Sequence, residues 1–150
     1  MKKAFTLIEL IFVIVIIGLL AAVAIPQFVK LRQHAEVANV FKTTVDAART
    51  AAEVAANLRD LEDNDTFELK DLIKLNGKGW KYFKDAEHPY GFYNYRDSVT
   101  GKSIAGIILK RDQNKIIYGV TCDRFRDPKT QEACKKLLGK NAVYHDDITY

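Results

Sequence analysis

Residues 5–26 read FTLIELIFVIVIIGLLAAVAIP, and this stretch decides how the rest of the chain is organised. Glu9 is the only charged residue between Phe5 and Lys30. Roughly 20 apolar residues at 1.5 Å rise are enough to cross a hydrocarbon core of about 30 Å. A carboxylate inside such a span is costly and marks a functional position by default. The sequence therefore predicts a membrane-spanning helix with a functional carboxylate that has no visible partner in the chain.

The N-terminal sequence resembles the signal of type IV pilins and type II secretion pseudopilins. That signal has a short basic leader, the phrase FTLIEL across a processing site, and an apolar helix with a glycine and a proline, here Gly18 and Pro26. The resemblance implies a leader peptide over 1–4 and a transmembrane and polymerisation helix over 5–26. It also implies a periplasmic or extracellular head over 27–150, which includes the second half of the helix.

The same resemblance assigns roles to individual residues. A prepilin peptidase would cut between Ala4 and Phe5 and methylate the new Phe5 amine. The family usually has glycine where this chain has Ala4, so we expect slower processing. The amine of an incoming subunit and Glu9 of one already in the fibre would neutralise each other in a low-dielectric layer, making Glu9 an assembly residue. The alternative is that Glu9 only stabilises the N-terminus of its own helix.

Two simpler interpretations of the N-terminus compete with this one. A secretory signal peptide would use Lys2 and Lys3 as its basic region, residues 10–20 as its apolar region and 22–24 as a cleavage site. It would leave a soluble exported protein beginning at Ile25. A plain signal anchor is the second alternative. Both leave Glu9 and FTLIEL unexplained, because an apolar region gains nothing from a carboxylate at its start.

Composition and cysteine content agree with export. The 150 residues suffice for one domain plus the anchor, and the net charge is +4. Loss of Lys2 and Lys3 would leave 21 basic side chains against 19 acidic ones, or +2. Cys122 and Cys134 suit a disulfide made in an oxidising compartment, with two unpaired thiols as the alternative. Neither has the nearby histidine or second cysteine pair of a zinc site.

Helix is predicted to continue beyond the membrane. Pro26 should kink it, since proline removes a backbone donor and clashes with an earlier carbonyl, and Gly18 should weaken it locally. From Leu31 onward, apolar or small residues recur at spacings of three and four and predict one buried face: Ala35, Ala38, Phe41, Val45, Ala48, Ala52, Ala55 and Leu58. A helix from Phe5 to about Leu58 spans on the order of 80 Å, half of it protruding from the head.

The remaining sequence predicts a small α+β head with an antiparallel sheet. An acidic turn over 62–65 ends the long helix, and Asp65 with Glu68 resembles a capping box for a short helix to Asn76, closed by Gly77. An irregular aromatic stretch follows over 80–95. Residues 103–110 and 115–122 predict a hairpin through 111–114. Residues 128–138 predict a helix that ends at Gly139.

The sequence favours assembly over catalysis. It contains no Gly-rich phosphate loop, HExxH, CxxC or nucleophile elbow. The clusters Asp85, Glu87, His88 and His145, Asp146, Asp147 lack a calcium-loop spacing, and solvated loop charge is the preferred interpretation of both. We therefore predict no enzyme, no metal site and no cofactor.

A basic, aromatic segment is the one hint of nucleic acid. Its lysines and aromatic residues interleave phosphate-seeking charge with stacking surfaces: Lys74, Lys78, Lys81 and Lys84 with Trp80, Tyr82 and Phe83. We favour the alternative, in which the aromatic side chains fill the core and the lysines face solvent, because the net charge is small.

Together these features predict a structural subunit of a type IV pilus or pseudopilus. It would be held in the inner membrane by one span and then polymerised with itself and other pilin-like subunits, by an inner-membrane assembly platform, into a periplasmic or surface filament. A loop closed by Cys122 and Cys134 resembles that of many pilin heads and favours a pilin over a pseudopilin. The alternative function is a signal-anchored or secreted α+β binding domain that does not polymerise.

Overall fold

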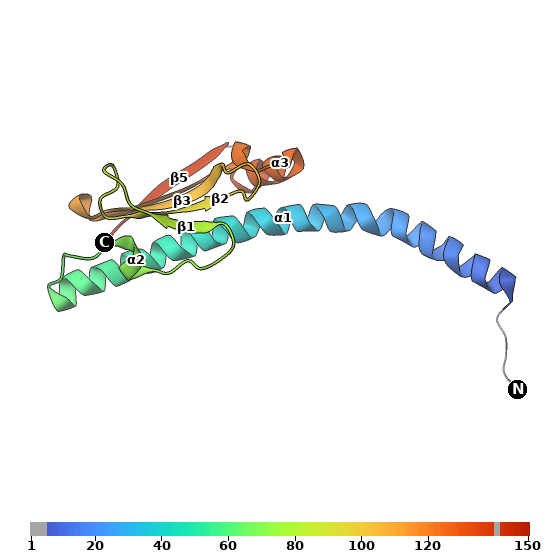
Figure 1. Ribbon diagram of the computed structural model, residues 1–150, viewed down its shortest axis with the longest axis horizontal. Helices are drawn as coiled ribbons and strands as arrows, with labels where there is room; N and C mark the ends of the chain where they lie inside the picture. The colour runs from blue at the N-terminus through green and yellow to red at the C-terminus, as the bar shows by residue number, and fades with distance from the viewer. Residues whose placement is uncertain (1–5, 140–141) are drawn as a thin grey trace, which may run out of the picture.

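The computed structural model describes residues 6–139 and 142–150, and one long helix dominates it (Figure 1). Helix α1 runs from Leu7 to Glu62, about 84 Å at 1.5 Å per residue. It ends at the acidic turn that the sequence predicts, where Asp63 has φ 49° and Asn64 N donates to Leu58 O at 3.1 Å. The helix is continuous through Gly18 and Pro26, and Figure 1 shows a gradual curve. A kink located at either residue stays a prediction.

The C-terminal half of α1 supports the head with a face of small side chains. Ala48, Ala52 and Ala55 are buried as predicted. The prediction is wrong about two to four turns earlier, where Ala35 and Ala38 are exposed and Val37 and Val40 are buried instead. Both sets fit helical spacing, and the sheet covers the one that carries the larger apolar side chains.

Within the described residues, five antiparallel strands form a sheet in sequence order, and α1 lies across one face of it (Figure 1). The strands are β1 (Trp80–Phe83), β2 (Phe92–Arg96), β3 (Ser103–Lys110), β4 (Lys115–Thr121) and β5 (Val143–Thr149). Ile107, Leu109 and Ile116 point to α1 and are fully buried. The sheet and the alanine face of α1 thus form one core.

The predicted β3–β4 hairpin is confirmed, whereas three other strands correct the sequence analysis. In the hairpin turn, η1 (Arg111–Gln113) leads to Asn114 at φ 53°. The aromatic stretch predicted to be irregular contains β1 and β2, which pair from Trp80–Tyr95 to Phe83–Phe92. Residues 145–147, predicted to lie in a loop, belong to β5 and pair with β4.

The short helix after α1 also differs from its prediction. Helix α2 covers only Leu69–Leu72, and its capping box uses Glu68 and Asp71 rather than Asp65 and Glu68. Chain extension resumes at Ile73, whose side chain is buried in the core. Tyr93 donates its hydroxyl to the Ile73 carbonyl at 3.1 Å, so tertiary packing ends the helix well before Asn76.

Helix α3 (Pro128–Leu137) confirms the prediction for residues 128–138. Asp127 caps it, accepting a hydrogen bond from Thr130 N at 3.2 Å, and Pro128 occupies its first turn. A second core cluster lies beneath α3 and includes Val37, Val40 and Ile104.

Candidate functional site

The N-terminal half of α1 is an apolar surface that the head leaves uncovered. Within the described chain, α1 is the one helix long and apolar enough to span a membrane, and none of its most apolar 18-residue window, mean hydropathy 3.1, is buried. In Figure 1 this half extends alone to the right of the head. Its exposed large apolar residues are Leu7, Ile8, Leu10, Ile11, Phe12, Val13, Ile14, Val15, Ile16, Ile17, Leu19, Leu20, Val23, Ile25, Phe28, Val29 and Leu31.

Glu9 lies at the start of this apolar surface and closes a capping box with Thr6. Its Oε2 accepts hydrogen bonds from Thr6 N at 2.9 Å and from Thr6 Oγ1 at 2.8 Å. In return, Glu9 N donates to Thr6 Oγ1 at 3.4 Å. The carboxylate thus satisfies the Thr6 amide, and the Thr6 hydroxyl satisfies the Glu9 amide, two donors that have no partner within the helix.

Thr6 is a helix-capping residue that the sequence analysis did not single out. The spacing Thr-x-x-Glu directly before an apolar run is a known start signal for a helix, and could have identified it. The predicted processing residues, Ala4 and Phe5, lie outside the described residues.

A side-chain contact fixes where the head begins along α1. Gln33 Nε2 donates to Asp127 Oδ2 at 2.6 Å, and this bond joins α1 to the N-terminus of α3. Gln33 comes two residues after Leu31, the last of the exposed large apolar residues in this half of α1. The head therefore begins about half a helical turn beyond the apolar surface.

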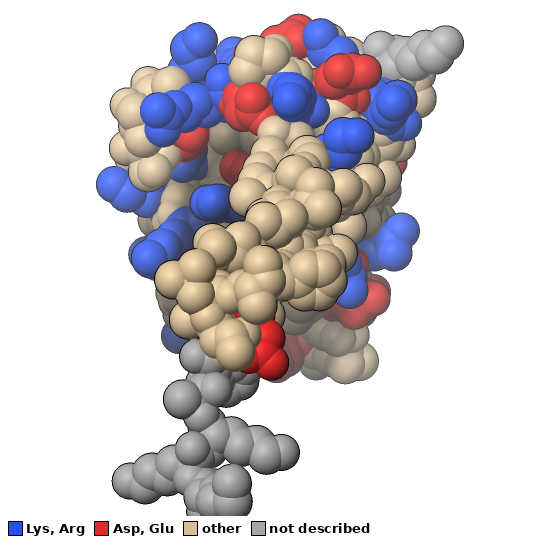
Figure 2. All heavy atoms as spheres, turned by 90° about the vertical axis from the view of Figure 1, so that its right-hand side faces the viewer, with Lys and Arg blue, Asp and Glu red and all other residues tan. Residues whose placement is uncertain are grey.

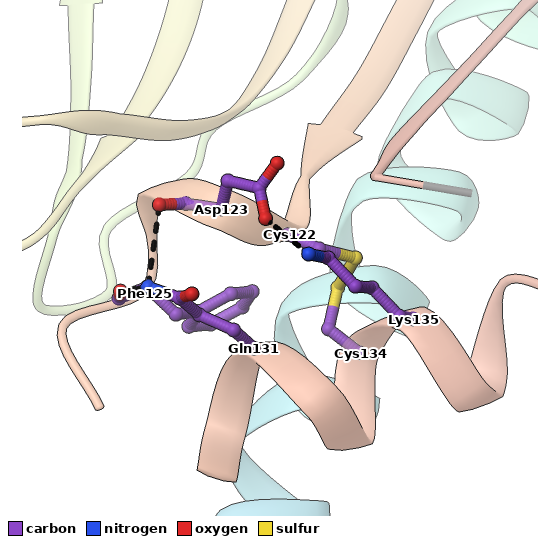
Figure 3. The surroundings of a disulfide bond; sticks show 6 residues. All are labelled: Cys122, Asp123, Phe125, Gln131, Cys134 and Lys135. Atoms are coloured by element: carbon purple, nitrogen blue, oxygen red, sulfur yellow. Dashed lines mark hydrogen bonds and ion pairs between the residues drawn. A yellow bond between two sulfur atoms is a disulfide. The ribbon is translucent and has the colours of Figure 1, made fainter. Parts of the chain in front are cut away.

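The predicted disulfide is present and ties α3 to the sheet (Figure 3). Cys122, in η2 (Cys122–Arg124) at the end of β4, is bonded to Cys134 of α3, and both are fully buried. Gln131 Nε2 donates to the Phe125 carbonyl at 2.7 Å, and Lys135 forms an ion pair with Asp123. These contacts fix the loop that precedes Asp127.

The two candidate cation clusters do not converge. On β5, Asp146 accepts from the hydroxyls of Tyr118 and Tyr144, both at 3.1 Å, whereas Asp147 pairs with Lys115 at 2.9 Å. Alternation along the strand separates neighbouring side chains onto opposite faces. A hydrogen bond from the Asp147 amide, followed by the two tyrosine hydroxyls, lowers the pKa of Asp146.

In the other cluster, Asp85 Oδ1 lies 2.9 Å from Nδ1 of His88 and accepts from its amide at 2.8 Å. These bonds lower the pKa of Asp85, and the His88 side chain makes the larger contribution. Among the residues that the structure describes, no group of three or more His, Cys, Asp or Glu is arranged to hold a metal ion.

The basic, aromatic segment divides between core and surface. Trp80 and Tyr82 pack against the core, as predicted. Phe83 instead lies on the outer face of the sheet, stacked on Phe92 with ring centroids 5.5 Å apart. Lys84 pairs with Glu68 at 2.6 Å, so its charge is already engaged within the head.

Comparison with known proteins addresses the N-terminus first. Residues 1–25 match the model of the prokaryotic N-terminal methylation motif. The N-terminus of the chain is therefore similar to that of proteins that carry this methylation motif. The motif coincides with the exposed apolar part of α1 and with the Thr6–Glu9 cap.

The relatives that the chain resembles are named as fimbrial or pilus proteins. It is 29% identical to a fimbrial protein of Moraxella nonliquefaciens over 97% of this chain and 79% of the relative. It is 55% identical over 53 residues to the type IV narrow pilus major component PilA5 of Thermus thermophilus, covering 35% of this chain and 45% of that one. It is 48% identical over 54 residues to a fimbrial protein of Pseudomonas aeruginosa, covering 36% and 34%.

No solved structure matches the chain significantly. The chain spans most of the Moraxella relative but less than half of the other two. The motif and these relatives support a structural subunit of a pilus.

Proposed function

We propose that the chain is a filament subunit of the type IV pilus class, held in the inner membrane by the N-terminal half of α1 and then polymerised through it. One observation carries the proposal: some 25 residues of helix expose an almost wholly apolar surface. Lipid can cover that surface in the stored subunit. Outside a membrane, only other apolar surfaces can cover it, and the same segment of neighbouring subunits supplies them.

Glu9 is the residue that we assign to the register between subunits. Both described hydrogen bonds to its side chain use Oε2, so Oε1 is available to a cation from a neighbouring subunit. Beside it, Ile8, Phe12 and Val13 line a shallow hollow of about 350 Å³. The α-amine of an N-terminal aromatic residue fits a carboxylate oxygen beside an apolar hollow, and processing between Ala4 and Phe5 would create such an amine.

The order of events follows from this chemistry. A prepilin peptidase would first remove residues 1–4 and methylate Phe5, because the amine does not exist before the cut. An inner-membrane assembly platform would then add the processed subunit to the fibre. Its Phe5 amine would meet Glu9 of a subunit already in place, where low dielectric strengthens the attraction.

A pilus is favoured over a secretion pseudopilus by the relatives, which are named as fimbrial or pilus proteins. The closed loop between Cys122 and Cys134 agrees with the resemblance to pilin heads. We therefore place the finished filament at the cell surface.

Expression of the chain as the sole subunit in a cell with a pilus assembly machine tests the proposal. Sheared surface fractions should contain filaments under the electron microscope. Mass spectrometry of their protein should identify methylated Phe5 as the first residue. Protein that begins at Ile25, or that stays in the membrane with residue 1 intact, would refute the proposal.

A further inference from the structure

The head has two oppositely charged ends. The basal end, at the anchor, comprises residues 30–36, 78–79, 96–103 and 121–139, and there ten Lys and Arg face five Asp and Glu. The distal end comprises 59–72, 84–91, 110–115 and 147–150, with six Lys and Arg against ten Asp and Glu. Figure 2 looks toward the head from the anchor side and shows Lys and Arg around the apolar helix.

Contacts within the chain bring distant segments together at each end. At the basal end, a groove of about 570 Å³ lies between α1, the β2–β3 loop and the start of α3. At the distal end, Arg59 Nη1 donates to the Tyr150 carbonyl at 2.8 Å and Arg111 Nη1 to the Phe67 carbonyl at 3.2 Å. Charges from distant parts of the sequence are therefore held together at both ends.

Each end also exposes an apolar side chain among its charges. Leu61 is 81% exposed at the distal end, between Asp60 and Glu62. Val99 is 66% exposed at the basal end and lines the groove together with Arg32 and Arg126. An apolar contact surrounded by opposite charges is the usual anatomy of a specific interface.

Three acidic residues line the groove, Glu36, Asp97 and Asp127, and the last two accept hydrogen bonds from their neighbours. Asp127 accepts from Gln33 and Thr130, and Asp97 accepts from the amides of Val99 and Thr100. The Thr100 amide makes the largest contribution to lowering the pKa of Asp97. Arg32 and Arg126 are the cations of the groove, and the excess of Lys and Arg over the whole basal end supplies the rest of the attraction for an incoming carboxylate.

The dimensions of α1 bring the two ends of different subunits together. The anchor part, residues 7–32, is about 39 Å long, and the part within the head, 33–62, is about 45 Å. In a filament, the heads would cover the anchors of other subunits. If two subunits are displaced along the filament by about the length of a head, the distal end of the lower head lies directly below the basal end of the upper head. This alignment of the two ends rests on the filament proposed above.

We propose that the distal end of one head, with Leu61 and its flanking carboxylates, docks into the basal groove of a second copy of this chain. A lipid surface would account for the basic end alone. A second copy accounts for both ends and for both exposed apolar residues. The contact joins two different surfaces, so repeating it generates an open helical filament rather than a closed dimer.

Charge reversal in the full chain tests this contact. Arg126→Glu with Lys129→Glu alters the basal end, and Glu62→Lys with Asp65→Lys alters the distal end; all four side chains are exposed. Each pair should reduce sheared filaments roughly tenfold, because like charges then meet at every repeat. Combining all four substitutions should restore the yield to within about twofold of wild type. The matched control is Lys74→Glu with Lys81→Glu, because both lysines are exposed but belong to neither end. This variant should assemble normally.

A cross-link tests the same contact directly. Leu61→Cys with Val99→Cys should give a ladder of disulfide-linked subunits in sheared filaments, and Leu61→Cys alone should give none. Normal filaments from both reversed pairs would overturn the docking. The docking would also be overturned if the combined variant did not restore the filament yield and the yield instead changed with the anionic lipid content of the membrane. That result would assign the basal end to the membrane surface. Absence of filaments from the wild-type chain would instead refute the proposed function.

Discussion

Glu68 gathers three partners on the surface of the head. It accepts from Lys84 at 2.6 Å, Lys70 at 3.1 Å and the Tyr82 hydroxyl at 3.0 Å. The Lys84 side chain makes the largest contribution, followed by Lys70 and Tyr82, and together they lower the pKa of Glu68 to about 2. The ionised form of Glu68 is therefore favoured by folding.

This shift predicts a stability difference confined to one pH range. Because folding lowers the pKa, the stabilisation is present above the ordinary value of 4.5 and is lost as pH falls from there to about 2. Glu68→Gln should therefore be less stable than wild type at pH 7, and the two should converge near pH 2. Urea unfolding of the full chain in detergent at pH 7, 4 and 2.5 measures the difference. A difference that stays constant over this range would contradict the account.

Gly91 offers a second test at a single residue. It has φ 85°, and a Cβ there would lie 2.0 Å from the Tyr82 hydroxyl, so Ala adds a severe clash to backbone strain. Gly101, with φ 67° and nothing within 4 Å, is the matched control that adds the strain alone. We expect Gly91→Ala to lower the free energy of unfolding by about 3 kcal/mol and Gly101→Ala by about 1 kcal/mol. Equal losses would show that the space around Gly91 is unimportant.

Among the elements, those with a strong single pattern were predictable from sequence. The β3–β4 hairpin combines alternating burial with a polar turn, and α3 has a proline start and a glycine end. Strand β1 lacks such a pattern because aromatic side chains occupy both faces, with Trp80 and Tyr82 inward and Phe83 outward. Its alternation is therefore invisible to a hydrophobicity count.

Strand β5 was missed for the opposite reason. In this edge strand Tyr144 and Ile148 pack against the core, but Asp146 lies between them on the same face, where the hydroxyls of Tyr118 and Tyr144 satisfy it. The error at α2 has a tertiary cause, since Ile73 enters the core and the helix stops there. Neither the hydrogen bonds to Asp146 nor the packing of Ile73 can be predicted before the fold is known.

The disulfide makes a prediction at the scale of α3. A loop closed across 12 residues contributes about 3 kcal/mol in the chain-entropy model, which corresponds to roughly 10 °C in Tm. Cys134→Ser should lower the Tm of the full chain in detergent by about that amount. Cys122→Ser should match it, because either substitution opens the same loop. Unchanged melting, or two reactive thiols in exported protein, would contradict the bridge.

At the scale of the whole molecule, the sequence identifies the anchor and its carboxylate but not how the head is joined to them. Glu9 stands out in residues 5–26 as the only charged side chain, whereas Phe5 is identified only through the resemblance of FTLIEL to a processing signal. The Gln33–Asp127 bond links residues 94 positions apart, and no local pattern predicts it. That bond leaves the apolar half of α1 outside the head, where a membrane or other subunits can cover it.

Glu9 distinguishes a structural role of the carboxylate from a role in assembly. The cap with Thr6 shows that Glu9 stabilises the start of its own helix, whereas polymerisation requires it to meet the amine of a neighbour. Thr6→Val removes the hydroxyl of the cap and keeps the carboxylate, so it is the matched control. If Glu9 only capped its helix, the two variants would behave alike.

The most direct measurement is the filament yield of Glu9→Leu, expressed as the sole subunit beside wild type and Thr6→Val. Sheared filaments are counted by electron microscopy, and the processed, membrane-bound pool is quantified in parallel. We predict a normal processed pool for Glu9→Leu, since the substitution removes a charge from lipid, with filaments reduced at least tenfold. Thr6→Val should retain most of its filaments. Normal filaments from Glu9→Leu would contradict the pairing of Glu9 with the amine of the next subunit.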